Sequence, residues 1–228
     1  MKSLYIGIPV MICILLSACT HEYVTPVENT WRIDVSLTFT DPEFWPDGQQ
    51  MRVGVFDEDN ARQAVGSVQV SRPENNSTTV SVGHVPEGQY RLQLYLTENG
   101  VYKVMVADLG EVSLTENASI ESSPLTLLTY SRVQRQVFNN CQLCHGGSSG
   151  ELAANLNLTE GNSYGSLVGV TAVKNPAMIR VRAGSANFSY LLKVLQKEID
   201  FDHPASSSAT ASDRQLVIDW INEGAKNN

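Results

Sequence analysis

The apolar residues of this chain change their spacing near residue 130. Before that point they alternate with polar residues, as in Trp31, Ile33, Val35, Leu37 and Phe39. A period of two is typical of a strand with one buried face, whereas the spacing of three or four in residues 131–141 is typical of an amphipathic helix. The charge changes at the same place: residues 19–129 hold sixteen acidic and six basic residues, and residues 130–228 hold eight and nine. We therefore expect two domains, residues 31–129 and 130–228.

The first of these segments is expected to be an all-β sandwich. It contains about seven short β-rich runs, separated by turn residues such as Asn99-Gly100. Residues 85–90, Val-Pro-Glu-Gly-Gln-Tyr, resemble a turn of transthyretin-like and Ig-like modules on bacterial surface lipoproteins. No catalytic constellation is apparent in this segment. A spacer, a docking surface and a glycan binder all stay open as its role.

The first eighteen residues have the features of a signal peptide. Lys2 precedes an apolar run, Leu4 to Leu16, that is short for a membrane span. The run ends in Leu-Ser-Ala-Cys19, which resembles the bacterial lipobox. In that family the cysteine is acylated and begins the mature protein. An ordinary secretory signal and an uncleaved anchor are the alternatives.

The residues after the lipobox suit a membrane tether. Residues 19–30 are polar and include Pro26. Thr20, which follows the cysteine, is not the acidic residue that retains such lipoproteins at the inner membrane. We therefore expect a lipid on Cys19 and a location at the outer membrane, on its periplasmic or its surface face.

Two of the four cysteines form the motif with the strongest chemical meaning. Cys13 leaves with the signal peptide and Cys19 carries lipid, which leaves Cys141 and Cys144, directly followed by His145. CxxCH is the attachment signature of c-type haem, because thiols one helical turn apart can each bond a porphyrin vinyl group above a histidine that binds the iron. A redox dithiol, half a zinc site and a disulfide are the alternatives. The motif predicts one covalently bound haem c.

The residues around the motif resemble the single-haem cytochrome c domains of environmental bacteria. The resemblance covers about residues 130–226. It rests on Val137-Phe138 before the motif, on Val181-Arg182-Ala183-Gly184 with Ser189-Tyr190-Leu191, and on residues 219–225 at the end. It implies that residues 130–228 form an all-α, class I cytochrome c-like haem domain. It also implies one-electron transfer with redox partner proteins.

Three helices are expected in that segment. They cover residues 131–141, residues 187–199 with Phe188 on the buried face, and residues 212–225. Ser212 and Gln215 have the spacing of a capping box at the start of the last helix.

The sequence departs from the family pattern at the sixth iron ligand. Such domains usually carry Met-Pro before the last helix, and this chain carries His203-Pro204 there. Neutral imidazole is a good iron ligand, which predicts His145 and His203 on opposite sides of the iron. Met178 is the rival donor, and an iron without a sixth protein ligand is the third possibility.

We therefore expect a membrane-anchored electron carrier and not an enzyme. A haem-based gas sensor or a peroxidase would need an open sixth position. A surface binding protein would place the function in residues 31–129. The net charge of −8 argues against nucleic acid as a partner.

Overall fold

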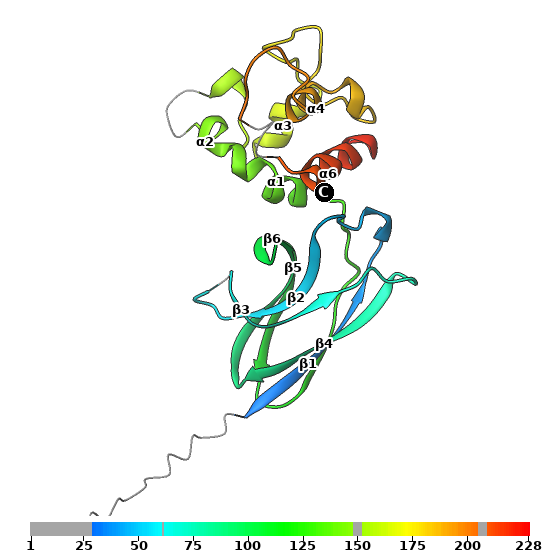
Figure 1. The fold of residues 1–228 in the computed structure, drawn as a ribbon, viewed down its shortest axis with the longest axis vertical. Coiled ribbons are helices and arrows are strands. Elements are labelled where there is room, and N and C mark those ends of the chain that lie inside the picture. The colour runs from blue at the N-terminus through cyan, green and yellow to red at the C-terminus, as the bar shows by residue number, and fades with distance from the viewer. Residues whose placement is uncertain (1–28, 61, 148–151, 205–208) are drawn as a thin grey trace, which may run out of the picture.

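The computed structural model describes residues 29–60, 62–147, 152–204 and 209–228. The expected signal peptide, Cys19 and all but the last two residues of the expected tether lie outside the described residues. Strands occupy one end of the molecule and helices the other, with the C-terminus near their boundary (Figure 1). Within the described ranges, none of the helices has the length and apolar character needed to cross a bilayer.

Seven strands form two sheets. One sheet has the order β4-β1-β7 and the other the order β3-β2-β5-β6. All pairs are antiparallel except β1 with β7. The strands are β1 (Thr30–Thr38), β2 (Gln50–Phe56), β3 (Ala64–Val70), β4 (Ser77–Pro86), β5 (Gly88–Glu98), β6 (Val101–Leu114) and β7 (Ala118–Glu121).

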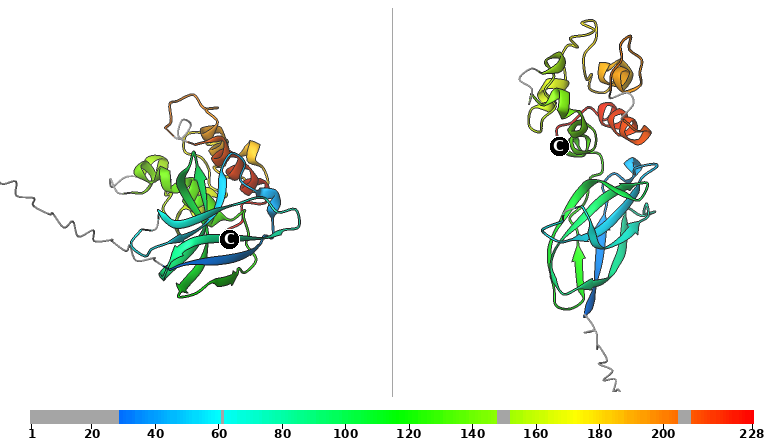
Figure 2. Two further views of the ribbon diagram at one scale, coloured as in Figure 1. Left: turned by 60° about the horizontal axis from the view of Figure 1, so that its bottom comes forward. Right: turned by 60° about the vertical axis from the view of Figure 1, so that its left-hand side comes forward.

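The two sheets face each other (Figure 2) and enclose one apolar core. The alternation in β1 places Ile33, Val35 and Leu37 in this core, where none of them is exposed. The turn between β5 and β6 is Asn99-Gly100, with φ of 52° and 78°. Positive φ at both positions matches the right-handed twist of a two-residue hairpin, which is why this dipeptide predicted the turn.

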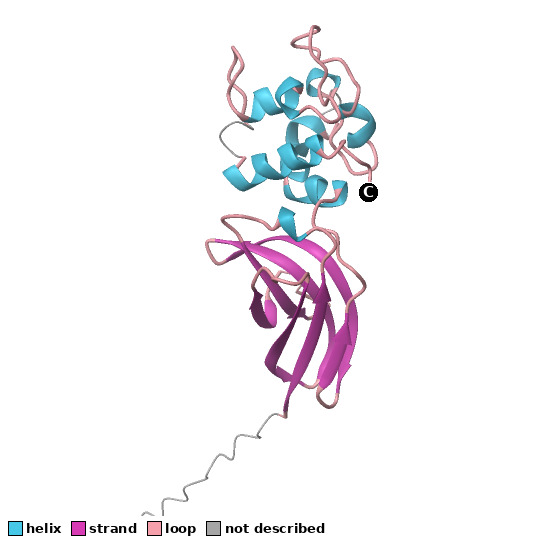
Figure 3. Ribbon diagram, turned by 90° about the vertical axis from the view of Figure 1, so that its right-hand side faces the viewer, coloured by secondary structure: helices cyan, strands magenta, loops and turns pink. Residues whose placement is uncertain are grey.

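The described helices are short, and all of them except η1 follow the strands in sequence. They are α1 (Tyr130–Gln136), α2 (Gln142–His145), α3 (Ser163–Leu167), α4 (Tyr190–Leu195) and α6 (Ala211–Asn222), with 3-10 helices η1 (Pro42–Phe44), η2 (Phe138–Cys141), η3 (Ala153–Asn155) and η4 (Ala186–Phe188). Loops connect them over long stretches (Figure 3). They pack around a second apolar core, which includes Phe138, Trp220 and Ile221.

The expected fold class is wrong. The described part of the chain is predominantly β, with 36% of its residues in strands and 25% in helices, and no all-α, cytochrome c-like C-terminal domain is evident in it. Only α6 exceeds seven residues among the described helices of this region. Between α2 and α6 the backbone mostly runs through turns and isolated bridges. Frequent Gly, Ser and Asn residues there favour turns over helix.

The details of the expected helices also need correction. The helix expected over residues 131–141 breaks at Val137, and that expected over 187–199 is the six-residue α4. Phe188 is 67% exposed and does not belong to a buried face. The last helix is capped two residues earlier than expected: Thr210 and Asp213 form the capping box, not Ser212 and Gln215. Threonine followed three residues later by an acid gives the same reciprocal bonds.

Three of the contacts that join the strand-rich region to the helices involve Asp41, Arg135 and Asp213. The Asp41 carboxylate accepts hydrogen bonds from the backbone N–H of Leu127 (2.6 Å) and Leu128 (2.9 Å), just before α1. Arg135 of α1 donates to the carbonyls of Met105 and Val106 in β6, both at 3.2 Å.

The third contact is a buried carboxylate at the start of α6. Asp213 is 5% exposed and lies 3.0 Å from Lys103 Nζ of β6. Burial alone would raise its pKa, but hydrogen bonds from Gln136, the Thr210 N–H and Lys103 outweigh burial and hold the pKa below its usual value. The ionised form of Asp213 therefore stabilises the fold.

We predict that Asp213→Asn lowers the free energy of unfolding by about 2–4 kcal/mol at pH 7, because Lys103 loses a buried partner. A carboxyl group whose pKa is lowered by folding stabilises above its unfolded pKa, and this stabilisation disappears as the pH falls through the folded value. The difference from the wild type should therefore shrink below about pH 4. Urea unfolding at pH 7 and pH 3 measures the loss of unfolding free energy and its decrease at low pH.

Glu98→Gln is the control. It removes the more exposed partner of Lys103 and should lower the free energy of unfolding by under about 1 kcal/mol. An equal cost for the two variants would contradict this.

Candidate functional site

The cysteine motif lies at the break after α1. The Thr129 hydroxyl accepts from the Arg132 N–H and begins α1, and the chain then turns at Val137 into η2 and α2. Cys141 ends η2, and Cys144 and His145 end α2. Both cysteines are free thiols, Cys141 partly buried and Cys144 exposed.

The structure brings His203 across from His145. The two ring centres are 6.1 Å apart and the ring planes differ by 20°. His145 is 7% exposed. Its Nδ1 lies 3.0 Å from the Ala153 carbonyl oxygen, which can only accept, so Nδ1 carries the proton. This bond leaves Nε2 of a neutral imidazole as the ring nitrogen with a lone pair, the arrangement usual for metal-binding histidines.

The separation of the rings fits a shared metal ion. An imidazole–metal bond is about 2 Å long and the ring centre lies about 1 Å behind the nitrogen, so two opposed ligands have ring centres about 6 Å apart. The observed 6.1 Å agrees. Burial lowers the pKa of His203, and the neighbouring His145 lowers it further, which favours the neutral, metal-binding form.

The thiols and imidazoles line one cavity of about 320 Å³. This volume is in the range of cofactor sites, about 300–1,000 Å³. Much of its wall is apolar: Phe138, Leu156, Leu158, Leu167, Leu191 and Leu195 are among its residues. Among the described residues that line it there is no Asp or Glu, and Lys174 and Arg180 are the charged ones apart from the histidines.

Arg180 is the residue of this cavity that the sequence did not reveal. It is 7% exposed, and it donates to the carbonyls of Ser166 (2.7 Å), Ala154 (2.8 Å) and Asn155 (3.3 Å). It forms no ion pair within the part of the chain described. A buried guanidinium without a carboxylate favours an anionic group in the cavity. The sequence feature that could have revealed Arg180 is a charged residue inside the apolar run Met178-Ile179-Arg180-Val181.

The segment η3 supports both functional side chains. The Ala153 carbonyl holds His145 and the Ala154 carbonyl holds Arg180. Ala154 and Asn155 have φ of 56° and 50°, a left-handed conformation that costs energy in residues with a Cβ. In this conformation the successive carbonyl groups of Ala153 and Ala154 bond to His145 and Arg180.

Met178, the rival iron donor, is not among the residues that line the cavity. It lies in a turn, where its N–H donates to Asn175 and its carbonyl accepts from Ala172. The donor set in the cavity is therefore two thiols and two imidazoles, the residue types that would hold a covalently bound haem and its iron.

The scan against protein-family models and the search of curated proteins find no match to this chain.

The two thiols should differ in reactivity before any cofactor is attached. Burial raises the pKa of the Cys141 thiol, and Cys144 raises it further. Because the thiolate is the reactive form and Cys144 is exposed, we predict that iodoacetamide alkylates Cys144 at least about tenfold faster than Cys141 at pH 7.5. Peptide-level mass spectrometry of haem-free protein measures the two rates. In urea the rates should become equal, and equal rates in the folded protein would be evidence against this environment of Cys141.

Proposed function

We propose that this protein is a c-type electron carrier that holds one haem c covalently through Cys141 and Cys144, with His145 and His203 as the iron ligands. The observation that carries the proposal is the pair of imidazoles 6.1 Å apart in the cavity that also holds both thiols. The proposal depends on these side chains and does not require an all-α fold. The haem supplies the redox chemistry, a change between Fe(III) and Fe(II) as one electron enters or leaves.

The chain's own residues would hold the cofactor and set its potential. The Ala153 carbonyl fixes the ring of His145, and the apolar walls keep water out and lower the local dielectric constant. An imidazole in place of a methionine thioether lowers the potential, whereas the nearby positive charge of Arg180 raises it by disfavouring Fe(III). Arg180 and Lys174 are also suited to the two propionate groups of a haem.

An exposed edge beside the motif supports electron exchange with another protein. Leu143, between the two cysteines, is 88% exposed, and Val173 of the cavity wall is 50% exposed. Electron transfer needs little covalent chemistry from the protein, so an accessible cofactor edge is sufficient for a redox partner. We propose no enzymatic activity.

The cell-envelope location is part of the same proposal. The signal sequence and Cys19 support a lipid-anchored protein, and haem attachment to CxxCH requires export in the families that the motif resembles. The outer membrane remains the proposed site of the anchor.

The placement of His203 makes a gas sensor or a peroxidase the less favoured function. Both need a sixth position that is open or easily vacated, and the separation of the two histidines suits simultaneous binding. His203 could serve a peroxidase only as an acid–base group that leaves the iron free.

We predict that the full-length protein, made in a host that attaches c-type haem, is low-spin without the absorbance band of Fe–Met ligation. Carbon monoxide should leave the spectrum of the reduced protein unchanged. His203→Ala should give a high-spin spectrum that shifts with carbon monoxide, while Met178→Leu should match the wild type. Spectra of the oxidised, reduced and carbon monoxide-treated proteins are the measurement. Absence of covalent haem would refute the function, and a carbon monoxide response in the wild type would favour the sensor or peroxidase.

We further predict that Arg180→Gln lowers the midpoint potential by about 20–60 mV, since removal of a buried positive charge favours Fe(III). Arg180→Lys keeps the charge and should stay close to the wild type. Arg182, two residues away and exposed, supplies the matched control: Arg182→Gln should change the potential by less than about 10 mV. Spectroelectrochemical titration measures all four proteins, and equal shifts for the two glutamine variants would exclude a specific role for Arg180.

A further inference from the structure

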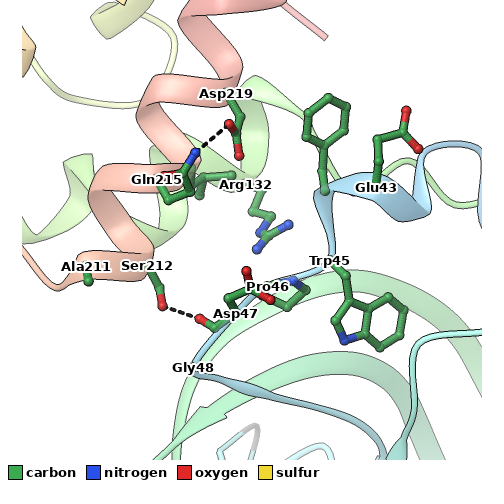
Figure 4. A pocket seen from close by; sticks show the side chains of 12 residues that line it. Glu43, Trp45, Pro46, Asp47, Gly48, Arg132, Ala211, Ser212, Gln215 and Asp219 are labelled. Carbon is green, nitrogen blue, oxygen red and sulfur yellow. Dashed lines mark hydrogen bonds between the residues drawn. The ribbon is translucent and has the colours of Figure 1, made fainter.

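A second cavity lies where the sheets meet the helices. It has a volume of about 580 Å³ and lies between the segment Glu43 to Gly48, on one side, and α1 and α6 on the other (Figure 4). It shares no lining residue with the haem cavity. The Ser212 hydroxyl of α6 donates to the Asp47 carbonyl and joins the two sides.

The innermost charged group of this cleft is the guanidinium of Arg132. Arg132 is 2% exposed, and its guanidinium extends into the space between Asp219 and Asp47 (Figure 4). Nε donates to Gln136 at 3.3 Å and Nη1 to the Leu127 carbonyl at 2.9 Å. Nη2 has no hydrogen-bond partner among the described residues, nor does the guanidinium form an ion pair there. Because Nη2 is not among the fully buried atoms that lack a partner, it is open to the cleft, where a ligand oxygen can accept a hydrogen bond from it.

Acceptors surround this donor. Asp219 is partly buried, accepts from Gln215 at 2.8 Å, and has a pKa raised chiefly by burial. Glu43 and Asp47 are exposed at the rim of the cleft. Phe44, Trp45, Pro46 and Leu216 supply apolar surface between these groups.

The guanidinium, the carboxylates and the apolar side chains together restrict which ligands the cleft can bind. A simple anion would be attracted by Arg132 but repelled by three carboxylates, and a simple cation would leave the Arg132 donor unpaired. Hydroxyl groups both donate and accept, so adjacent hydroxyls can serve a carboxylate and a guanidinium at once. The C–H faces of a sugar ring can in turn cover the apolar surface.

We propose that the cleft between the sheets and α6 binds a neutral saccharide, with Arg132 and Asp219 as its central polar contacts. A site at the junction of two structural units is a common place for small ligands. The proposal does not rest on the haem or on electron transfer. It gives the strand-rich half of the chain a role in binding, next to the redox function proposed for the other half.

The test is calorimetric titration of the full chain with neutral sugars. The probes are glucose, galactose, mannose, xylose, N-acetylglucosamine, cellobiose and maltose, with sodium acetate as the anion and glycine as the zwitterion. We expect at least one sugar to bind with a dissociation constant of about 1 mM or lower. Asp219→Ala and Gln215→Ala should each weaken that binding by about tenfold, because each removes a hydrogen bond to the ligand at the surface of α6.

Two controls keep the result interpretable. Glu116→Gln removes an exposed carboxylate that does not line the cleft and should leave affinity within about twofold. Arg132→Lys tests the buried donor, and circular dichroism checks that this variant folds. Binding unaffected by the Asp219 and Gln215 variants, binding of acetate or glycine without sugar, or no sugar binding at about 10 mM would each overturn the proposal.

Discussion

The carboxylate of Asp41 determines where the chain leaves its sheets. By accepting the N–H groups of Leu127 and Leu128, it fixes the two residues that precede the cap of α1. α1 then leads through a break at Val137 directly into the cysteine motif. The position of the cavity around the cysteine motif relative to the sheets therefore depends on Asp41, which precedes His145 by 104 residues in the chain. Arg135 and Asp213 reinforce the same junction from α1 and α6.

Local sequence patterns predicted the elements whose conformation depends on residues close together in the chain. Alternation located β1, the Asn-Gly dipeptide located the hairpin between β5 and β6, and the cysteine spacing located the motif. His203 was singled out as a candidate ligand because it stands where a related pattern has methionine, and that role stays a prediction. Each of these signals involves residues close together in sequence, so no knowledge of tertiary packing was needed.

The errors arose where packing overrides local preference. Phe188 fits a helical apolar face, but α4 begins only at Tyr190 and leaves Phe188 in η4, exposed. Ser212 is a residue type that often caps helices, but Thr210 is the cap of α6. Thr210 shares reciprocal hydrogen bonds with the buried Asp213, which pairs with Lys103 of β6. The all-α expectation failed for the same reason: the turns between α2 and α6 are held by backbone and side-chain bonds such as those of Arg180. None of these long-range partners can be inferred from spacing.

The use of main-chain oxygens at η3 bears on how such a site can evolve. Ala153, Ala154 and Asn155 support His145 and Arg180 through carbonyl groups that every amino acid possesses. A substitution at these three positions keeps the carbonyl supports if the left-handed backbone of residues 154 and 155 is kept and the new side chain does not fill the cavity, whereas an insertion or deletion would displace both supports together. Natural selection would preserve the length of this loop more strictly than its composition. Distant descendants of such a chain could keep the site while losing recognisable similarity around it.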